Sequence, residues 1–189
     1  MVMVHKRTER WQRYLLLAVT ALCVGAMVVV ALRAYRTPTP QLLQLADGTQ
    51  IYYLSDTRID PAPTYPTVRE VKIDGEAFVR ATGNEQPLVI RTRLMVLKIT
   101  GSSALRVTAH SNEAGQEADV LYGRVEATKA YASTQNEPDI LLAGQEVMVN
   151  ETIDLQEKET ADVPGLQAWS NALIASVTGK AAGAGKPAR

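Results

Sequence analysis

Residues 67–81 read TVREVKIDGEAFVRA, and this stretch decides the fold class. Valine, isoleucine and phenylalanine recur in it at short spacing between charged residues, in the alternating pattern of half-buried β-strands. Asp74-Gly75 interrupts that pattern and is a turn signal, because glycine accepts a positive φ. The stretch therefore predicts two short strands, 67–73 and 76–81, joined by a turn.

The same pattern recurs on both sides of this stretch. Further segments rich in β-branched residues predict strands at 49–54, 88–92, 94–99, 104–109, 119–122, 124–128 and 146–150. Turn signals separate them, at Asp47-Gly48, Gly83-Asn84, Gly101-Ser102, residues 112–115, Gly123 and Ala143-Gly144. No long amphipathic helix lies between these segments, which disfavours parallel βαβ winding. The sequence predicts an all-β domain over residues 42–153, built as a sandwich, a barrel or a solenoid.

An apolar stretch precedes this domain. Residues 14–32 (YLLLAVTALCVGAMVVVAL) carry no charge, and as a helix they would span roughly 28 Å, close to the hydrocarbon core of a bilayer. The short basic tail 1–13 lies before them and a proline-containing linker, 33–41, follows. More cations before the span than after it favour a cytoplasmic amino end. We expect a single-pass inner-membrane anchor with the β-domain in the periplasm; a cleaved signal peptide is the alternative.

Charge and composition exclude several function classes. Residues 40–155 carry ten Lys and Arg against sixteen Asp and Glu, and such an acidic domain repels nucleic acid. Cys23 is the only cysteine, so no disulfide forms within the chain. The two histidines, His5 and His110, are isolated and match no metal site. No nucleophile motif or phosphate loop is present. We therefore expect no catalytic residues, no metal, no cofactor and no enzyme activity.

Beyond residue 153 the pattern becomes helical. Asp162 is placed to cap a helix and Pro164 suits its first turn. One face of this helix carries a stripe of large apolar residues, namely Leu166, Trp169, Leu173 and Val177. Packing against the β-domain is favoured, since an exposed stripe promotes aggregation; docking of a partner protein is the alternative. Residues 154–178 are thus expected to be a linker and helix, and 179–189 a disordered tail.

Five motifs occur in the order found in one known family. Residues 45–57 (LADGTQIYYLSDT), 69–81 (REVKIDGEAFVRA), 87–92 with 96–107 (PLVIRT, VLKITGSSALRV), 121–127 (LYGRVEA) and 142–147 (LAGQEV) carry the match. Together they resemble the periplasmic domain of the FecR family. The structural positions of that resemblance are Asp47, Gly48, Gly75, Glu76, Phe78, Gly101, Gly123 and Gly144.

The resemblance implies a function and an architecture. FecR-like proteins are anti-sigma regulators of iron-uptake signalling, so it implies protein partners, a sigma factor or a TonB-dependent transporter. It also implies a twisted, solenoid-like β-stack. Relative to the family, the chain is expected to lack the cytoplasmic sigma-binding domain and the carboxyl-terminal transporter-contacting domain. The alternative function is an envelope module that binds glycan or peptidoglycan through exposed tyrosines, the candidates being Tyr52, Tyr53, Tyr65, Tyr122 and Tyr131.

Overall fold

The computed structural model describes residues 14–15, 17–27 and 38–184. The chain divides into two units, Met1–Pro38 and Thr39–Arg189. In the first unit, residues 14–15 and 17–27 are helical. Within the described residues, no helix combines the length and the apolar character needed to span a bilayer. The predicted tail 1–13 lies outside the described residues, as do residues 16 and 28–32 of the predicted span and residues 33–37 of the linker.

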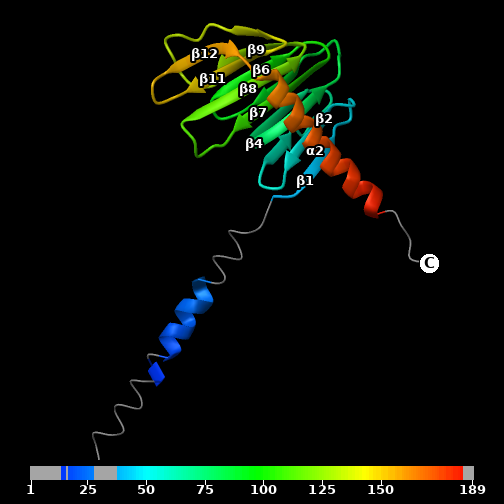
Figure 1. Ribbon diagram of the computed structural model, residues 1–189. Coiled ribbons are helices and arrows are strands. Elements are labelled where there is room, and N and C mark those ends of the chain that lie inside the picture. The colour runs from blue at the N-terminus through cyan, green and yellow to red at the C-terminus, as the bar shows by residue number, and fades with distance from the viewer. Residues whose placement is uncertain (1–13, 16, 28–37, 185–189) are drawn as a thin grey trace, which may run out of the picture. The chain divides into compact units, whose positions relative to one another are not determined.

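The described part of the second unit is a β-domain followed by one helix (Figure 1). Its strands are β1 (Pro40–Gln44), β2 (Gln50–Leu54), β3 (Arg58–Pro61), β4 (Glu70–Ala81), β5 (Leu88–Arg91), β6 (Met95–Ile99), β7 (Ser103–Ala109), β8 (Gly115–Tyr122), β9 (Arg124–Lys129), β10 (Asp139–Leu142), β11 (Gln145–Asn150) and β12 (Leu155–Thr160). Helix α2 follows at Val163–Ala184. The predicted mostly-β class with a carboxyl-terminal helix is confirmed.

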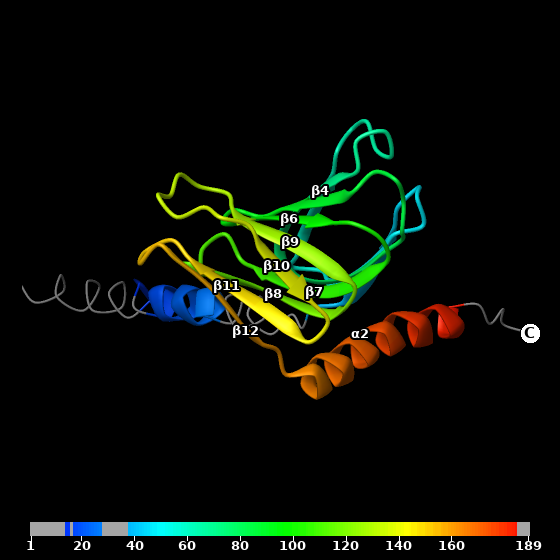
Figure 2. The ribbon, with the colours of Figure 1, turned by 90° about the horizontal axis from the view of Figure 1, so that it is seen from above.

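The strands form two layers that share β4. Sheet A has the order β1-β2-β4-β7-β8-β11-β12, and sheet B has the order β3-β4-β5-β6-β9-β10. The β10–β11 connection leads the chain from sheet B back to sheet A, so the arrangement resembles a nearly closed barrel (Figure 2). All strand pairs in the described residues are antiparallel except β4–β5. The solenoid-like stack implied by the resemblance is therefore not confirmed.

Strand β4 is continuous through Asp74-Gly75, so the predicted turn there is wrong. Residues before Gly75 pair with β3 and β5 in sheet B, and residues from Gly75 onward pair with β2 and β7 in sheet A. Gly75 has φ 122°, and an added Cβ would lie 2.7 Å from the hydroxyl oxygen of Thr57. Glycine thus bends the strand between layers instead of ending it. The second half of β4, in sheet A, and the loop 82–87 connect the two parallel-paired segments 70–72 and 89–91, and they replace a crossover helix.

The main core lies between the two sheets. Alternate residues of the strands point into it, and its fully buried members include Ile51, Val71, Ile90, Leu97, Leu105 and Val147. The period-2 pattern that predicted the strands is the pattern that fills this core. Four strands had no strong alternation of their own and were not predicted: β1, β3, β10 and β12. The sheet consequently extends from Pro40 to Thr160, beyond both ends of the expected 42–153 domain.

Helix α2 packs on the outer face of sheet A. Asp162 caps it through a 3.1 Å hydrogen bond from the Gly165 amide to its carboxylate. Leu166 and Leu173 are buried, and Trp169 and Val177 are half-buried, so the predicted stripe faces the sheet. The helix runs on to Ala184, into the segment expected to be a disordered tail.

Candidate interaction site

The first two family-like motifs meet in a buried ion pair. Arg69 Nη2 lies 2.5 Å from Asp47 Oδ2, and the two side chains are 2% and 3% exposed. Arg69 also donates to the carbonyls of Thr82 and Gln86, and the amide of Thr49 donates to Asp47. Burial favours the protonated form of Asp47, but the hydrogen bonds outweigh it and lower the pKa of this carboxyl. This pair therefore joins the two motifs inside the fold, away from solvent.

The glycines of the predicted structural set all have a positive φ; they are Gly48, Gly75, Gly101, Gly123 and Gly144. Gly123 separates β8 from β9, and an added Cβ would meet the side chain of Ser103 at 2.1 Å. Glu76 is half-buried on the outer face of sheet A, where its backbone bonds to the Thr57 hydroxyl. Phe78 is buried under α2 and does not belong to the core between the sheets. The structure thus scatters this set over the fold and forms no single site from it.

The outer face of sheet A is divided between α2 and a charged region. Under α2, Tyr52, Phe78 and Ala104 form a second apolar cluster with Leu173. The rings of Phe78 and Trp169 meet edge to face, with centroids 6.3 Å apart. The sequence alternates here between the two cores: Ala77 and Val79 point between the sheets, while Phe78 points to the helix.

Arg106 stands at the border between the helix and the charged region. Its guanidinium carbon lies 5.5 Å from the centre of the Trp169 ring, a cation–π distance. Its Nε donates to Asp119 at 2.9 Å and its Nη2 to Glu117 at 3.2 Å. One side chain on β7 therefore connects α2 to the carboxylates of β8.

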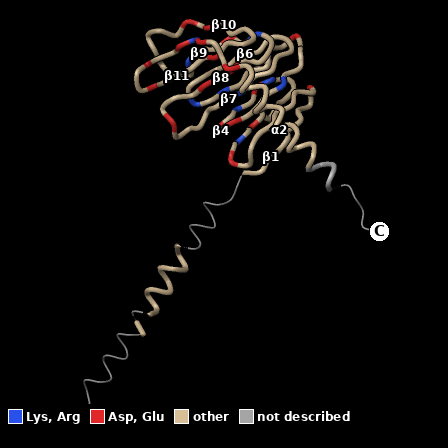
Figure 3. The backbone as a smooth tube through the Cα atoms, viewed as in Figure 1, with Lys and Arg blue, Asp and Glu red and all other residues tan. Residues whose placement is uncertain are grey.

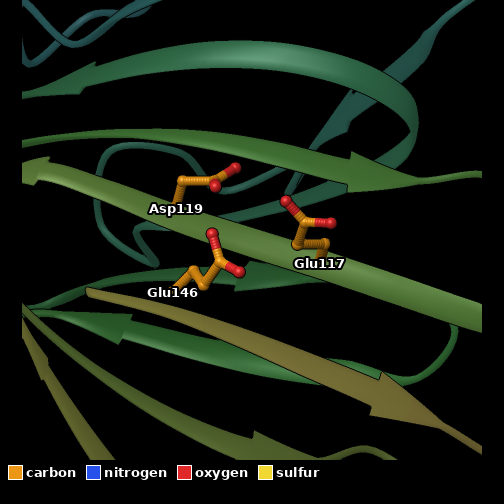
Figure 4. Close-up of side chains that lie close together, drawn as sticks. All are labelled: Glu117, Asp119 and Glu146. Carbon is orange, nitrogen blue, oxygen red and sulfur yellow. The ribbon is translucent and has the colours of Figure 1, made fainter. Parts of the chain in front are cut away.

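Glu117, Asp119 and Glu146 bring their carboxylates together (Figure 4). One oxygen from each lies within 4.8 Å of the others. Burial raises the pKa of Asp119 although Arg106 opposes it. Burial and the neighbouring Asp119 likewise raise the pKa of Glu117. Arg106 already supplies the positive charge for two of these carboxylates, so the arrangement is an ion-pair network with excess negative charge.

Strand register extends this cluster into two rows across sheet A. The first row contains Phe78, Arg106, Asp119, Glu146 and Glu159, and the second contains Glu76, Thr108, Glu117, Met148 and Glu157. Directly paired residues point to the same face of a sheet. We call the part of these rows outside α2, from Glu76 and Arg106 to β12, the acidic rows. They hold six carboxylates and one cation, and Figure 3 shows acidic residues along these strands.

Sequence reasoning missed this region. Arg106, Asp119 and Glu146 lie in predicted strands and Glu117 lies just outside one, but alternation cannot show which strands are neighbours. A signal was present in Glu117-Ala118-Asp119, where two acids flank a buried alanine. Two carboxylates on the same face of one strand repel each other, so this spacing indicates a locally charged face.

The tyrosines proposed as a glycan platform do not form one. Tyr52 is buried, and Tyr53, Tyr65 and Tyr131 are partly buried against the main core. Burial and the adjacent Asp47 carboxylate raise the pKa of Tyr65 to about 12. Tyr122 is exposed, so of these five residues one is available to stack on a sugar ring. The structure therefore lacks the group of exposed tyrosines that motivated the glycan-binding alternative.

Comparisons with known proteins agree with the family resemblance. The model of the family described as FecR protein matches residues 34–126. Two crystal structures, at 1.65 and 2.50 Å, of a candidate anti-sigma factor from Parabacteroides distasonis ATCC 8503 share the fold. Each has a TM-score of 0.60 and 25% sequence identity over 69% of this chain. The present chain spans 59% of the length of that protein. No curated protein matches the sequence.

The matched range runs from the residues before β1 into β9 and includes both partners of the buried Asp47–Arg69 pair. It ends before the 142–147 motif, which forms the turn between β10 and β11. The resemblance read from the sequence is therefore confirmed over its first three motifs and over all but the last residue of the fourth. Residues 34–126 of this chain match the FecR family model, so this part of the chain is a FecR-type domain.

Proposed function

We propose that this chain is a regulator in transmembrane signalling, anchored in the inner membrane and acting in the periplasm through protein contact. The observation that carries the proposal is the FecR match at residues 34–126, together with a structural neighbour described as an anti-sigma factor. Both are regulatory proteins, and regulation of this kind works by binding another protein. The excess of negative charge on the uncovered face of sheet A supports contact with a partner.

The anchoring part of the proposal comes from the uncharged stretch 14–32, which directly precedes the family match. A segment of this length and composition is suited to crossing a bilayer once. The greater number of cations before it orients the amino end to the cytoplasm. In this arrangement the β-domain receives the signal outside the membrane, and the span passes it inward to a sigma factor or its partner.

Cysteine labelling tests the location. Cys23 is the only native cysteine, so a Cys23→Ser background is free of thiols. Asn112→Cys then places one thiol in the exposed β7–β8 turn, and Thr8→Cys places one in the tail. In intact spheroplasts, a membrane-impermeant maleimide is expected to label position 112 and to leave position 8 unlabelled until lysis. Labelling of position 8 but not 112 refutes the orientation, and equal labelling of both refutes the anchor.

Transcript profiling tests the regulatory role. Deletion of the gene is expected to change the expression of one coherent set of promoters that share a sigma factor. Complementation with the full chain restores the set, whereas a chain that lacks residues 14–32 does not restore it. An unchanged transcript profile, in growth with and without iron limitation, refutes the regulatory proposal.

A further inference from the structure

The outer face of sheet A is only partly covered by the chain's own helix. Helix α2 contacts strands β1, β2 and β8 and covers Tyr52, Phe78 and Ala104. On the far part of the same face, Met148 is 43% exposed and Glu157 and Glu159 are exposed. Within the described residues, no element packs on this far part. It is a sheet face open to a partner.

Charge along the acidic rows is unfavourable for folding alone. Asp119, Glu146 and Glu159 occupy adjacent positions on three neighbouring strands. Like charges directly opposite each other destabilise a sheet. Within the described residues, Arg106 is the one cation that bonds to these rows, and it is shared between Glu117 and Asp119. The face therefore bears a cost in stability that a cationic partner would relieve.

A hollow in the same face can receive a side chain. It has a volume of about 130 Å³, and its walls include Thr108 of β7, Glu117 of β8 and Met148 of β11. Glu113, in the turn before β8, contributes a further carboxylate. The methyl group of Thr108 and the side chain of Met148 are suited to an alkyl stem, and the carboxylates to the charge at its end. Lysine and arginine have this division into an apolar stem and a charged head.

We propose that the acidic rows and this hollow form the docking surface for an extended, arginine- or lysine-containing segment of a partner protein. The inference rests on the proposed function, in which the chain acts by protein contact, and names the chemistry of that partner. Arg106 marks the inner border of the surface, and its bonds to Glu117 and Asp119 hold those carboxylates in place. A second copy of this chain is a poor occupant, since two acidic faces repel each other.

The raised pKa values of Glu117 and Asp119 support the same conclusion. A carboxyl group whose ionised form is disfavoured gains most when a cation arrives beside it. A bare divalent metal ion fits less well, because Arg106 already occupies two of the three carboxylates. Asp119 is buried, but Glu117 and Glu146 are partly exposed, so a basic side chain can enter beside Arg106 and meet these two carboxylates.

Binding of a defined peptide tests the surface. The probe is a fluorescein-labelled Gly-Arg-Gly-Arg-Gly-Arg-Gly peptide, measured by anisotropy with the full chain in non-ionic detergent. The double variant Glu117→Gln/Glu146→Gln is expected to weaken binding at least about tenfold. The control Asp60→Asn/Glu126→Gln removes the same charge from the outer face of sheet B, and we expect a change below about twofold.

A second pair of variants tests the hollow without changing charge. Thr108→Phe fills it with a β-compatible side chain and should weaken peptide binding about fivefold or more. Thr128→Phe makes the same change on the outer face of sheet B and should have no effect. Circular dichroism checks that all four variants fold; a variant that does not fold is replaced by the single Glu146→Gln change with Glu126→Gln as its control.

Three results overturn the inference: no binding of the peptide at low salt, equal loss in both charge variants, or equal binding by the two phenylalanine variants. Equal loss in the charge variants means diffuse attraction to an acidic domain. These results are independent of the location test, because the peptide is added to purified protein. A failure of the spheroplast labelling refutes the proposed location and leaves the binding measurement intact.

Discussion

Arg69 forms an ion pair with Asp47 at 2.5 Å across 22 positions of sequence, and both side chains are buried. A buried ion pair is not a large net gain, because both charges lose their water. Removing one partner is strongly destabilising, however, because the other buried charge is then left without a counter-ion. The pair therefore fixes how the turn before β2 lies against the start of β4.

Arg69→Ala is expected to destabilise the domain by about 3–5 kcal/mol, because Asp47 then remains buried without its counter-ion. Urea unfolding followed by circular dichroism measures the change. Arg58→Ala is the matched control: Arg58 and Asp60 form an exposed pair whose loss should cost less than about 1 kcal/mol. Similar losses in the two variants contradict the role assigned to burial.

The bend in β4 gives a second prediction. Gly75→Ala places a Cβ 2.8 Å from the backbone of Thr57 and forces alanine to φ 122°, so we expect a loss of roughly 3 kcal/mol or failure to fold. Gly115→Ala is the control, since its Cβ meets its nearest neighbours at 3.8 Å and should change stability by less than about 1 kcal/mol. Equal thermal midpoints for the two variants would show that the bend tolerates a side chain.

The sequence predicted the core of this fold because the core depends on local alternation. Val71 and Ile73 fill the space between the sheets as their spacing in the sequence indicates. The turn at Asp74-Gly75 was wrong for a physical reason: a positive φ serves a bend between two layers as well as a reversal of the chain. Only the position of Thr57 against Gly75 decides between these, and that contact joins residues distant in sequence.

The candidate site was beyond prediction for a related reason. Arg106, Asp119, Glu146 and Glu159 form one row only because β7, β8, β11 and β12 are neighbours in that order. Strand order in a sheet is set by tertiary packing and leaves little trace in the period of a single strand. The helix stripe, in contrast, was predictable, since its four residues recur at helical spacing along one segment.

The raised pKa of Glu117, in the acidic rows, predicts how the free energy of unfolding depends on pH. The pKa of Glu117 is raised in the folded state, so its contribution to stability is present below its ordinary pKa of 4.5 and is lost as pH rises through the folded value. Glu117→Gln removes this loss. We therefore expect the variant to be more stable than the parent chain at pH 8, with a gain that shrinks as pH falls to 4, measured by urea unfolding.

Glu137→Gln is the control for that measurement, because Glu137 is exposed and lies in the loop before β10. This substitution at an exposed loop position should change the free energy of unfolding by less than about 0.5 kcal/mol at each pH. A gain for Glu117→Gln that is constant with pH, or that grows on acidification, contradicts the assignment of a raised pKa.

Helix α2 supplies the last prediction. Trp169 packs against Phe78 and receives Arg106 over its ring, so Trp169→Ala removes the contacts that join the helix to both halves of the face. We expect a loss of about 3 kcal/mol, near the lower end of the cost for large aromatic truncations because Trp169 is only half-buried. Limited proteolysis should cut the variant within α2 while the β-domain stays intact.

Asn171→Ala, on the exposed side of the helix, is the control and should leave the free energy of unfolding and the proteolysis pattern unchanged. If the Trp169→Ala variant resists cleavage as the parent chain does, the apolar contacts of Leu166 and Leu173 alone hold the helix, and Arg106 does not connect α2 to the acidic rows.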